Sequence, residues 1–190
     1  MKKLQTLALS ALIVGAIAWA QSDKPAEKFT VANQLDRQVT VVEHEFVPAA
    51  EAMPDDKFDF APTGGEFKGV RTFGQQVTHV ASTNYMIAAA ILGEKPPVET
   101  EGPGENGPVS LKTKSDKVKY LKDSFVYAHK AVASITDQNM ITPMDNPFNP
   151  KAKTTRLNMA SVFGWHSFDH YGQMVEYLRM NGIVPPASRQ

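Results

Sequence analysis

Two of the five histidines in this 190-residue chain lie four positions apart, near its C-terminal end. His166 and His170 fall within the segment "WHSFDHYGQMVEYL", which has the hydrophobic periodicity of a helix. In a helix, side chains at positions i and i+4 share one face, with their β-carbons about 6 Å apart. Both imidazoles can therefore reach a single metal ion. Two ligands rarely hold a metal strongly, so the hypothesis requires a third.

His79 is the best candidate for the third ligand. It lies two turns inside an expected helix, on a line of residues that forms a partly polar edge and could border a cavity. The other members of this line are Thr72, Gln76, Thr83 and Met86. His44, flanked by two glutamates, and His129, next to a lysine, are expected at the surface. The competing interpretation makes each histidine an ordinary part-buried residue, although burying two imidazoles together costs desolvation unless something binds both.

The composition restricts both the kind of metal site and the kind of partner. The chain contains no cysteine, so a metal can be held only by histidine or carboxylate side chains, and no disulfide framework exists. Twenty basic residues balance twenty acidic ones. A near-neutral chain lacks the excess of positive charge that attracts nucleic acid or anionic membranes, and we expect no nucleic-acid partner.

The first twenty residues have the features of a signal peptide. Lys2 and Lys3 precede a mostly apolar stretch, and Ala18-Trp19-Ala20 provides the small-x-small pattern of a cleavage site. No other segment approaches the ~18 apolar residues of a membrane span. We therefore expect an exported protein, periplasmic or secreted, with a signal peptide at 1–20, one domain at 21–190 and no stable membrane anchor after cleavage.

Four segments of the mature chain show helical periodicity, and none shows a convincing two-residue alternation. The expected helices span about Thr30–Met53, Thr72–Leu92, Ser115–Ile135 and Leu157–Met180. Their apolar stripes predict an all-α fold, an antiparallel four-helix bundle with long connecting loops. A di-iron carboxylate bundle is disfavoured because no glutamate in these helices precedes a histidine by three positions.

Two long segments between the expected helices read as loops. Residues 94–110, "EKPPVETEGPGENGPVS", are too rich in Pro, Gly and Glu to bury a core, and predict a mobile surface loop. Residues 136–155, "TDQNMITPMDNPFNPKAKTT", are interpreted as a second long loop leading to the last helix.

The chain resembles the DinB-like family over about residues 29–186. The resemblance lies in "TFGQQVTHVASTNY" around His79 and in "FGWHSFDHYGQMVEYLRMNGIVPP" around His166 and His170. Members of that family share their fold with the bacillithiol- and mycothiol-dependent transferases of bacteria. The resemblance implies that the three histidines bind one divalent ion, zinc or nickel, and leave other coordination positions open to water.

Two classes of function follow from this interpretation. Three neutral imidazoles leave an ion with its full charge and an open position, which suits a metal-dependent hydrolase or group transferase acting on a small molecule. Asp169 is one option for a base, because "HSFDH" resembles the inverted zinc-protease motif with Asp in place of Glu. The alternative is a non-catalytic exported bundle in which the metal is structural or absent. The sequence leaves a homodimer open.

Overall fold

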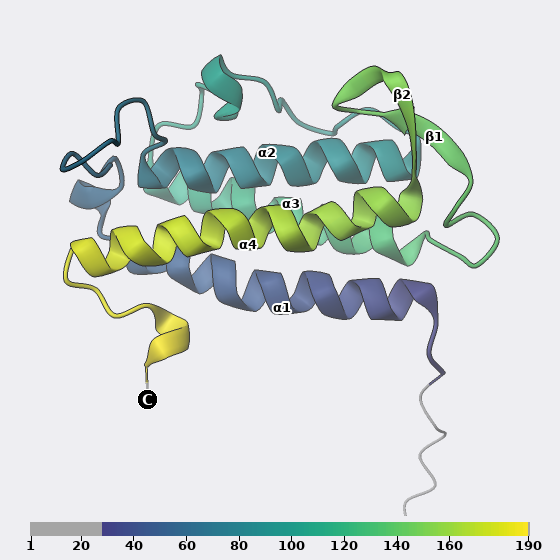
Figure 1. Cartoon of the computed structure of the whole chain (residues 1–190), viewed down its shortest axis with the longest axis horizontal. Helices are drawn as coiled ribbons and strands as arrows, with labels where there is room; N and C mark the ends of the chain where they lie inside the picture. The colour runs from purple at the N-terminus through teal and green to yellow at the C-terminus, as the bar shows by residue number, and fades with distance from the viewer. Residues whose placement is uncertain (1–27, 190) are drawn as a thin grey trace, which may run out of the picture.

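Four long helices make up most of the described chain. The structure is a computed structural model that describes residues 28–189, so the predicted signal peptide lies outside the described residues. The helices are α1 (Val31–Ala52), α2 (Phe73–Leu92), α3 (Lys114–Ala133) and α4 (Arg156–Met180) (Figure 1). Three single-turn 3₁₀ helices lie outside the bundle, at Asp55–Lys57, Pro103–Glu105 and Pro186–Ser188. Within the described range, no helix is both long and apolar enough to span a membrane.

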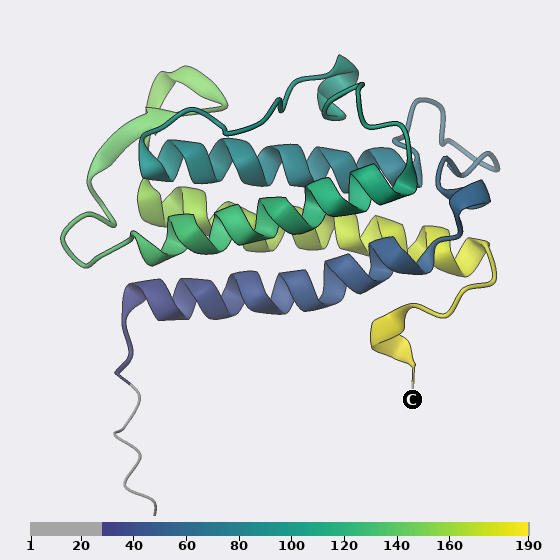
Figure 2. The same cartoon turned by 180° about the vertical axis from the view of Figure 1, so that it is seen from behind.

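The helices form a four-helix bundle with long connections, as the sequence predicted. Each helix packs against two others: α2 contacts α3 and α4, and α1 contacts α3 and α4. In Figure 2, α1 and α4 run from left to right, and α2 and α3 run from right to left; Figure 1 shows the same courses from the other side. The predicted antiparallel packing thus joins α1 to α3 and α2 to α4. In contrast, α2 and α3 run parallel because the segment 93–113 returns along the whole bundle before α3 begins.

Threonine side chains fix where the helices begin. Thr30, Thr72 and Thr113 each accept a hydrogen bond from the backbone amide three residues later, and the side chain of that later residue accepts one from the threonine amide. Such a capping box satisfies two backbone donors that have no partner inside the helix. Thr72 was predicted as a cap. The third helix was expected to begin at Ser115, but Thr113 caps it, because Asp116 completes the box with Thr113.

The core lies between the four helices, along the predicted apolar stripes. One phenylalanine from each helix is at least 99% buried, namely Phe46, Phe73, Phe125 and Phe163. At about 1.5–3 kcal/mol for each fully buried large apolar side chain, this core supplies the main favourable free energy of folding. The end of α2 is also as predicted: Gly93 takes the left-handed conformation (φ 73°) that ends many helices.

The segment expected to be a loop at 136–155 contains a β-hairpin. Strand β1 (Pro143–Asn146) pairs antiparallel with β2 (Asn149–Thr155), and Asp145 faces Lys153 across the pair. Its prolines obscured this hairpin, since proline lacks an amide hydrogen for a sheet ladder. In a two-stranded sheet both strands are edge strands, so prolines on the outer side are tolerated. The hairpin projects beside the start of α4 (Figure 1).

Candidate metal centre

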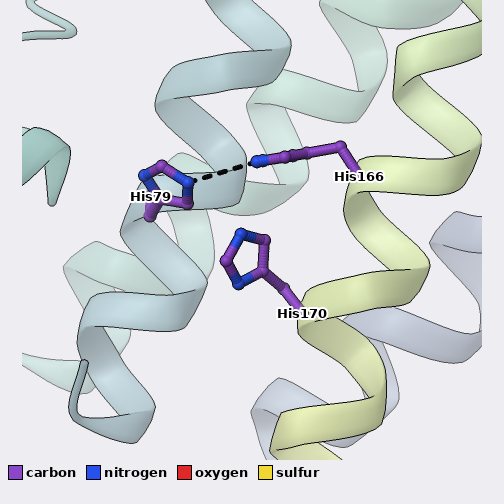
Figure 3. A group of neighbouring side chains, drawn as sticks. All are labelled: His79, His166 and His170. Atoms are coloured by element: carbon purple, nitrogen blue, oxygen red, sulfur yellow. Dashed lines mark hydrogen bonds between the residues drawn. The ribbon is translucent and has the colours of Figure 1, made fainter. Parts of the chain in front are cut away.

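Three histidines from two helices meet inside the bundle. His79 lies on α2, and His166 and His170 lie one turn apart on α4 (Figure 3). One ring nitrogen from each lies within 4.8 Å of the other two. Because α2 and α4 are antiparallel neighbours, a residue in the second turn of α2 faces the middle of α4. The structure therefore brings together the three residues that the sequence singled out, at a spacing suited to a shared metal ion.

The two remaining histidines lie elsewhere. His44 is exposed on α1, as expected. His129 was expected at the surface, but it is half-buried between α3 and α1, where its Nδ1 lies 2.6 Å from Asp36 and its Nε2 lies 3.1 Å from Glu43. Burial alone would lower the pKa of His129, but these two carboxylates outweigh it and raise the pKa. His129 thus belongs to a contact between helices and not to the candidate metal centre.

Hydrogen bonds orient two of the three imidazoles. His79 Nδ1 lies 2.6 Å from the backbone oxygen of Glu105, and His170 Nδ1 lies 2.5 Å from Oε1 of Gln76. Both oxygens can only accept, so each Nδ1 carries the hydrogen and each Nε2 keeps its lone pair. This is the tautomer that a ligand through Nε2 requires, and such partners orient metal-binding histidines in other proteins.

His166 differs from the other two histidines. Its Nε2 lies 3.1 Å from Nε2 of His79, and its Nδ1 is buried without a hydrogen-bond partner among the described residues. Since His79 carries its hydrogen on Nδ1, the Nε2–H of His166 donates to His79 in this arrangement. Binding an ion through Nε2 of His166 requires its hydrogen to move to Nδ1. The three imidazoles fit a divalent ion, and His166 is the one ligand whose Nδ1 has no hydrogen-bond partner among the described residues.

Burial keeps all three imidazoles neutral at pH 7. Desolvation lowers the pKa of His79, lowers that of His166 to about 4 and lowers that of His170 to about 3. The neighbouring histidines add to the effect on His166 and His170, because a second positive charge beside the first is unfavourable. Neutral imidazoles have free lone pairs, so protons compete weakly with a metal ion at neutral pH.

Glutamine side chains connect the cluster to the surface. Gln76, which is 1% exposed, donates from Nε2 to Oε1 of Gln173 at 2.9 Å. Gln173 in turn donates to Oδ2 of Asp169 at 3.3 Å. Asp169 is exposed on the outside of α4, where this series of hydrogen bonds ends, so it is an ordinary surface residue. The sequence placed Gln76 on the line of His79 but did not reveal its contact with His170, which depends on how α2 and α4 pack.

A pocket of about 920 Å³ opens beside the cluster and is here called the histidine pocket. Its lining residues include His79, Thr83 and Met86 from α2, and Val162, Trp165 and His166 from α4. Segment 93–113 and the tip of the β-hairpin, at Pro147 and Phe148, complete its walls. Glu99, Glu101 and Glu105 also line it, so titratable groups border the space next to two of the histidines.

Segment 93–113 is attached to α2, although the sequence predicted a mobile surface loop. Thr78 donates from Oγ1 to the backbone oxygen of Asn106 at 2.5 Å, and Arg71 donates from Nε to Oδ1 of the same residue at 2.7 Å. Gly107 is buried against the helix, where an added β-carbon would lie 2.7 Å from Oγ of Ser82. Its φ of 78° also favours glycine. The loop therefore forms a wall of the site.

Comparisons with known proteins place the chain among bundles of the same kind. A DinB-like protein from Bacillus cereus is 15% identical, with a TM-score of 0.63 over 84% of this chain and 98% of that chain. A conserved protein from Enterococcus faecalis is 17% identical, with a TM-score of 0.64 over 80% and 98%. YfiT from Bacillus subtilis, described as a probable metal-dependent hydrolase with an unusual four-helix bundle topology, is 20% identical, with a TM-score of 0.58 over 84% and 94%.

At these identities, the structural likeness shows the fold alone. No curated protein sequence matches the chain. The sequence model of the DinB superfamily, however, matches residues 38–174. This range is more than half of the chain, and it includes His79, His166 and His170. On this evidence the chain belongs to the DinB superfamily.

Proposed function

We propose that this protein is a metal-dependent hydrolase that binds one divalent ion through His79, His166 and His170 and acts on a small molecule in the histidine pocket. The observation that carries the proposal is the position of the pocket, whose lining includes two of the three histidines. An ion held only for structural reasons needs no such opening. Closed structural sites use all their positions for protein ligands, whereas catalytic sites keep one free.

Three neutral ligands leave the charge of a divalent ion uncompensated. Such an ion supplies a Lewis acid, which polarises a carbonyl group or makes water more acidic. The chain contributes the rest: Glu105 and Gln76 hold two imidazoles in the tautomer needed, and the pocket walls position the substrate. Zinc and nickel both suit imidazole ligands, and we propose one of these as the ion.

The description of YfiT as a probable metal-dependent hydrolase supports hydrolysis over group transfer, whereas the fold, which thiol-dependent transferases share, favours neither. We further propose that the protein is exported, on the signal-like pattern of residues 1–20. A thiol-dependent transferase would need a small cytosolic thiol, which an exported protein does not meet. Export therefore also favours the hydrolase.

The test begins with elemental analysis of the mature protein purified without an affinity tag. The expected result is about one zinc or nickel ion per chain. The purified protein is then assayed on a panel of esters, amides and phosphate esters, before and after chelation and after metal is restored. Activity that disappears with the metal and returns with it supports the proposal. A metal-loaded protein without hydrolytic activity would instead support the structural role.

A further inference from the structure

The histidine pocket has an acidic rim. Glu99, Glu101 and Glu105 are among its lining residues, and no lysine or arginine lines it in the described part of the chain. Arg71 donates from Nε to Asn106 and from Nη2 to the backbone oxygen of Gly104 at 3.1 Å. Its Nη2 also lies 4.0 Å from Oε2 of Glu105, so the uncompensated negative charge of the rim lies on Glu99 and Glu101. Carboxylates gathered around a cavity raise the local concentration of cations.

Aromatic side chains lie on the walls contributed by α4 and the hairpin. Trp165 is 62% exposed and Phe148 is 49% exposed, and both line the pocket. Not every aromatic residue of α4 is exposed, because Phe163, two residues before Trp165, is 1% exposed. Exposed aromatic faces attract cations through their quadrupole and bury apolar groups. The same pocket thus offers a surface for an apolar body as well as charge for a cation.

Thr83 supplies an independent sign of a ligand. It lies one helical turn beyond His79 on α2, is 4% exposed and lines the pocket. Its hydroxyl takes part in none of the hydrogen bonds formed among the described residues. The hydroxyl oxygen of Thr83 is not among the buried atoms that lack a partner, so this otherwise buried side chain leaves an unpaired polar atom accessible at the pocket wall. This position favours a ligand whose polar group meets Thr83 next to the metal ligands.

We infer that the substrates are small organic cations, in which an ammonium group is joined to an apolar or aromatic body. The ammonium group lies among the carboxylates of Glu99 and Glu101, the apolar body contacts Trp165, and a polar group reaches Thr83 beside His79. A volume of about 920 Å³ lies in the range of small-molecule sites. This inference rests on the proposed function and names the class of substrate.

The test compares three ligands of similar size on the metal-loaded protein by titration calorimetry at low ionic strength. These are 2-phenylethylammonium, the neutral 2-phenylethanol and the anionic 3-phenylpropanoate. The ammonium is expected to bind most tightly and the alcohol more weakly. The anion should also bind more weakly than the ammonium, because the rim repels it although the metal ion attracts its carboxylate. Added salt should weaken only the ammonium, because exposed charge pairs are screened.

Variants identify the groups responsible. The double variant Glu99→Gln/Glu101→Gln should weaken the ammonium about three- to tenfold, the sum of two exposed charge contacts, and leave the alcohol and the metal content unchanged. Thr83→Val should weaken the alcohol, whose hydroxyl can reach Thr83, and leave the affinity of the ammonium unchanged, because its only polar group lies among the carboxylates. Glu66→Gln is the matched control, because Glu66 is exposed in the loop before α2 and does not line the pocket.

Equal affinity for the ammonium and the alcohol, tighter binding of the anion, or an unchanged affinity in the double variant would each overturn the inference. Absence of any binding up to millimolar ligand would overturn it as well. These readouts measure binding and not turnover. A protein that prefers the ammonium yet hydrolyses nothing would therefore retain this inference and contradict the proposed hydrolase.

Discussion

The backbone oxygen of Glu105 lies 2.6 Å from Nδ1 of His79, so a loop residue fixes the tautomer of a buried helix residue. Glu105 holds a φ of 60°, the only positive φ of a non-glycine residue among those described. Such a conformation costs of order 1–3 kcal/mol and persists only where the surroundings enforce it. The contacts of the loop with α2 hold Glu105 in this conformation. Loss of these contacts should therefore weaken metal binding.

Gly107→Ala is the change that tests this coupling. An added β-carbon would lie 3.0 Å from the backbone oxygen of Thr78 and 2.7 Å from Oγ of Ser82, at a φ unfavourable to alanine. We expect a loss of about 1–3 kcal/mol in the free energy of unfolding and weaker metal binding. Gly64→Ala is the control, since nothing lies within 4 Å of its β-carbon position. Denaturant unfolding and metal titration measure both effects, and equal behaviour of the two variants would argue against the coupling.

Replacing Gln76 should weaken metal binding without removing a ligand. In Gln76→Leu, Nδ1–H of His170 loses its acceptor, so the imidazole is no longer held in orientation. Loss of such a partner typically lowers metal affinity 10- to 100-fold. Gln173→Ala is the matched control, because Gln173 contacts Gln76 and not a histidine. Competition with a chromophoric chelator measures the affinities. A similar loss in both variants would mean that the whole series of hydrogen bonds through Gln76 and Gln173, and not the single bond to His170, is responsible.

Metal removal should lower the stability of the protein without unfolding it. The apolar core is sufficient for a bundle of this size, whereas a bound ion adds about 2.7 kcal/mol when free metal exceeds its dissociation constant a hundredfold. A chelator should lower the melting temperature of the parent by several degrees. It should have no effect on His166→Ala or His170→Ala, while His44→Ala, at an exposed position, behaves like the parent. Outright unfolding by the chelator would contradict a bundle formed before the metal binds.

The contact of His129 with α1 should make stability depend on pH. Its pKa is raised in the folded protein by Asp36 and Glu43, so protonation favours folding. The stabilisation is full below the ordinary histidine pKa of about 6.5 and is lost as the pH rises through the higher folded value. The parent should exceed His129→Gln by up to about 1 kcal/mol at pH 5.5 and by less at pH 9. Urea unfolding at both values decides this, and a difference that grows with pH would contradict it.

Local patterns were sufficient to predict the helices and the meeting of the histidines. The stripe from Leu35 to Phe46 is buried as its spacing required, because helical periodicity is a local property. His166 and His170 share a face for the same reason. His79 could be selected because a third imidazole was needed, and the helix that carries it has a clear beginning at Thr72.

Features that join distant segments could not be predicted. The partner of His79 is a backbone oxygen 26 positions away, and any residue type carries such an oxygen. His129 stands next to Lys130 in sequence, and nothing local reveals that Asp36 and Glu43 approach it from α1. The parallel course of α2 and α3 depends on the path of segment 93–113, whose composition indicated only that it could not form a core.

The threonine cap of α2 also determines where an imidazole points. His79 follows Thr72 by seven positions, and each residue of an α-helix turns the next side chain by about 100°. One residue inserted between them would swing His79 away from α4 by more than a quarter of a circle while the helix stayed intact. Insertions in segment 93–113 or at the hairpin tip leave this angular phase unchanged. Natural variation can thus reshape the pocket walls away from Glu105 and Gly107 without turning His79, whereas the first two turns of α2 have a fixed length.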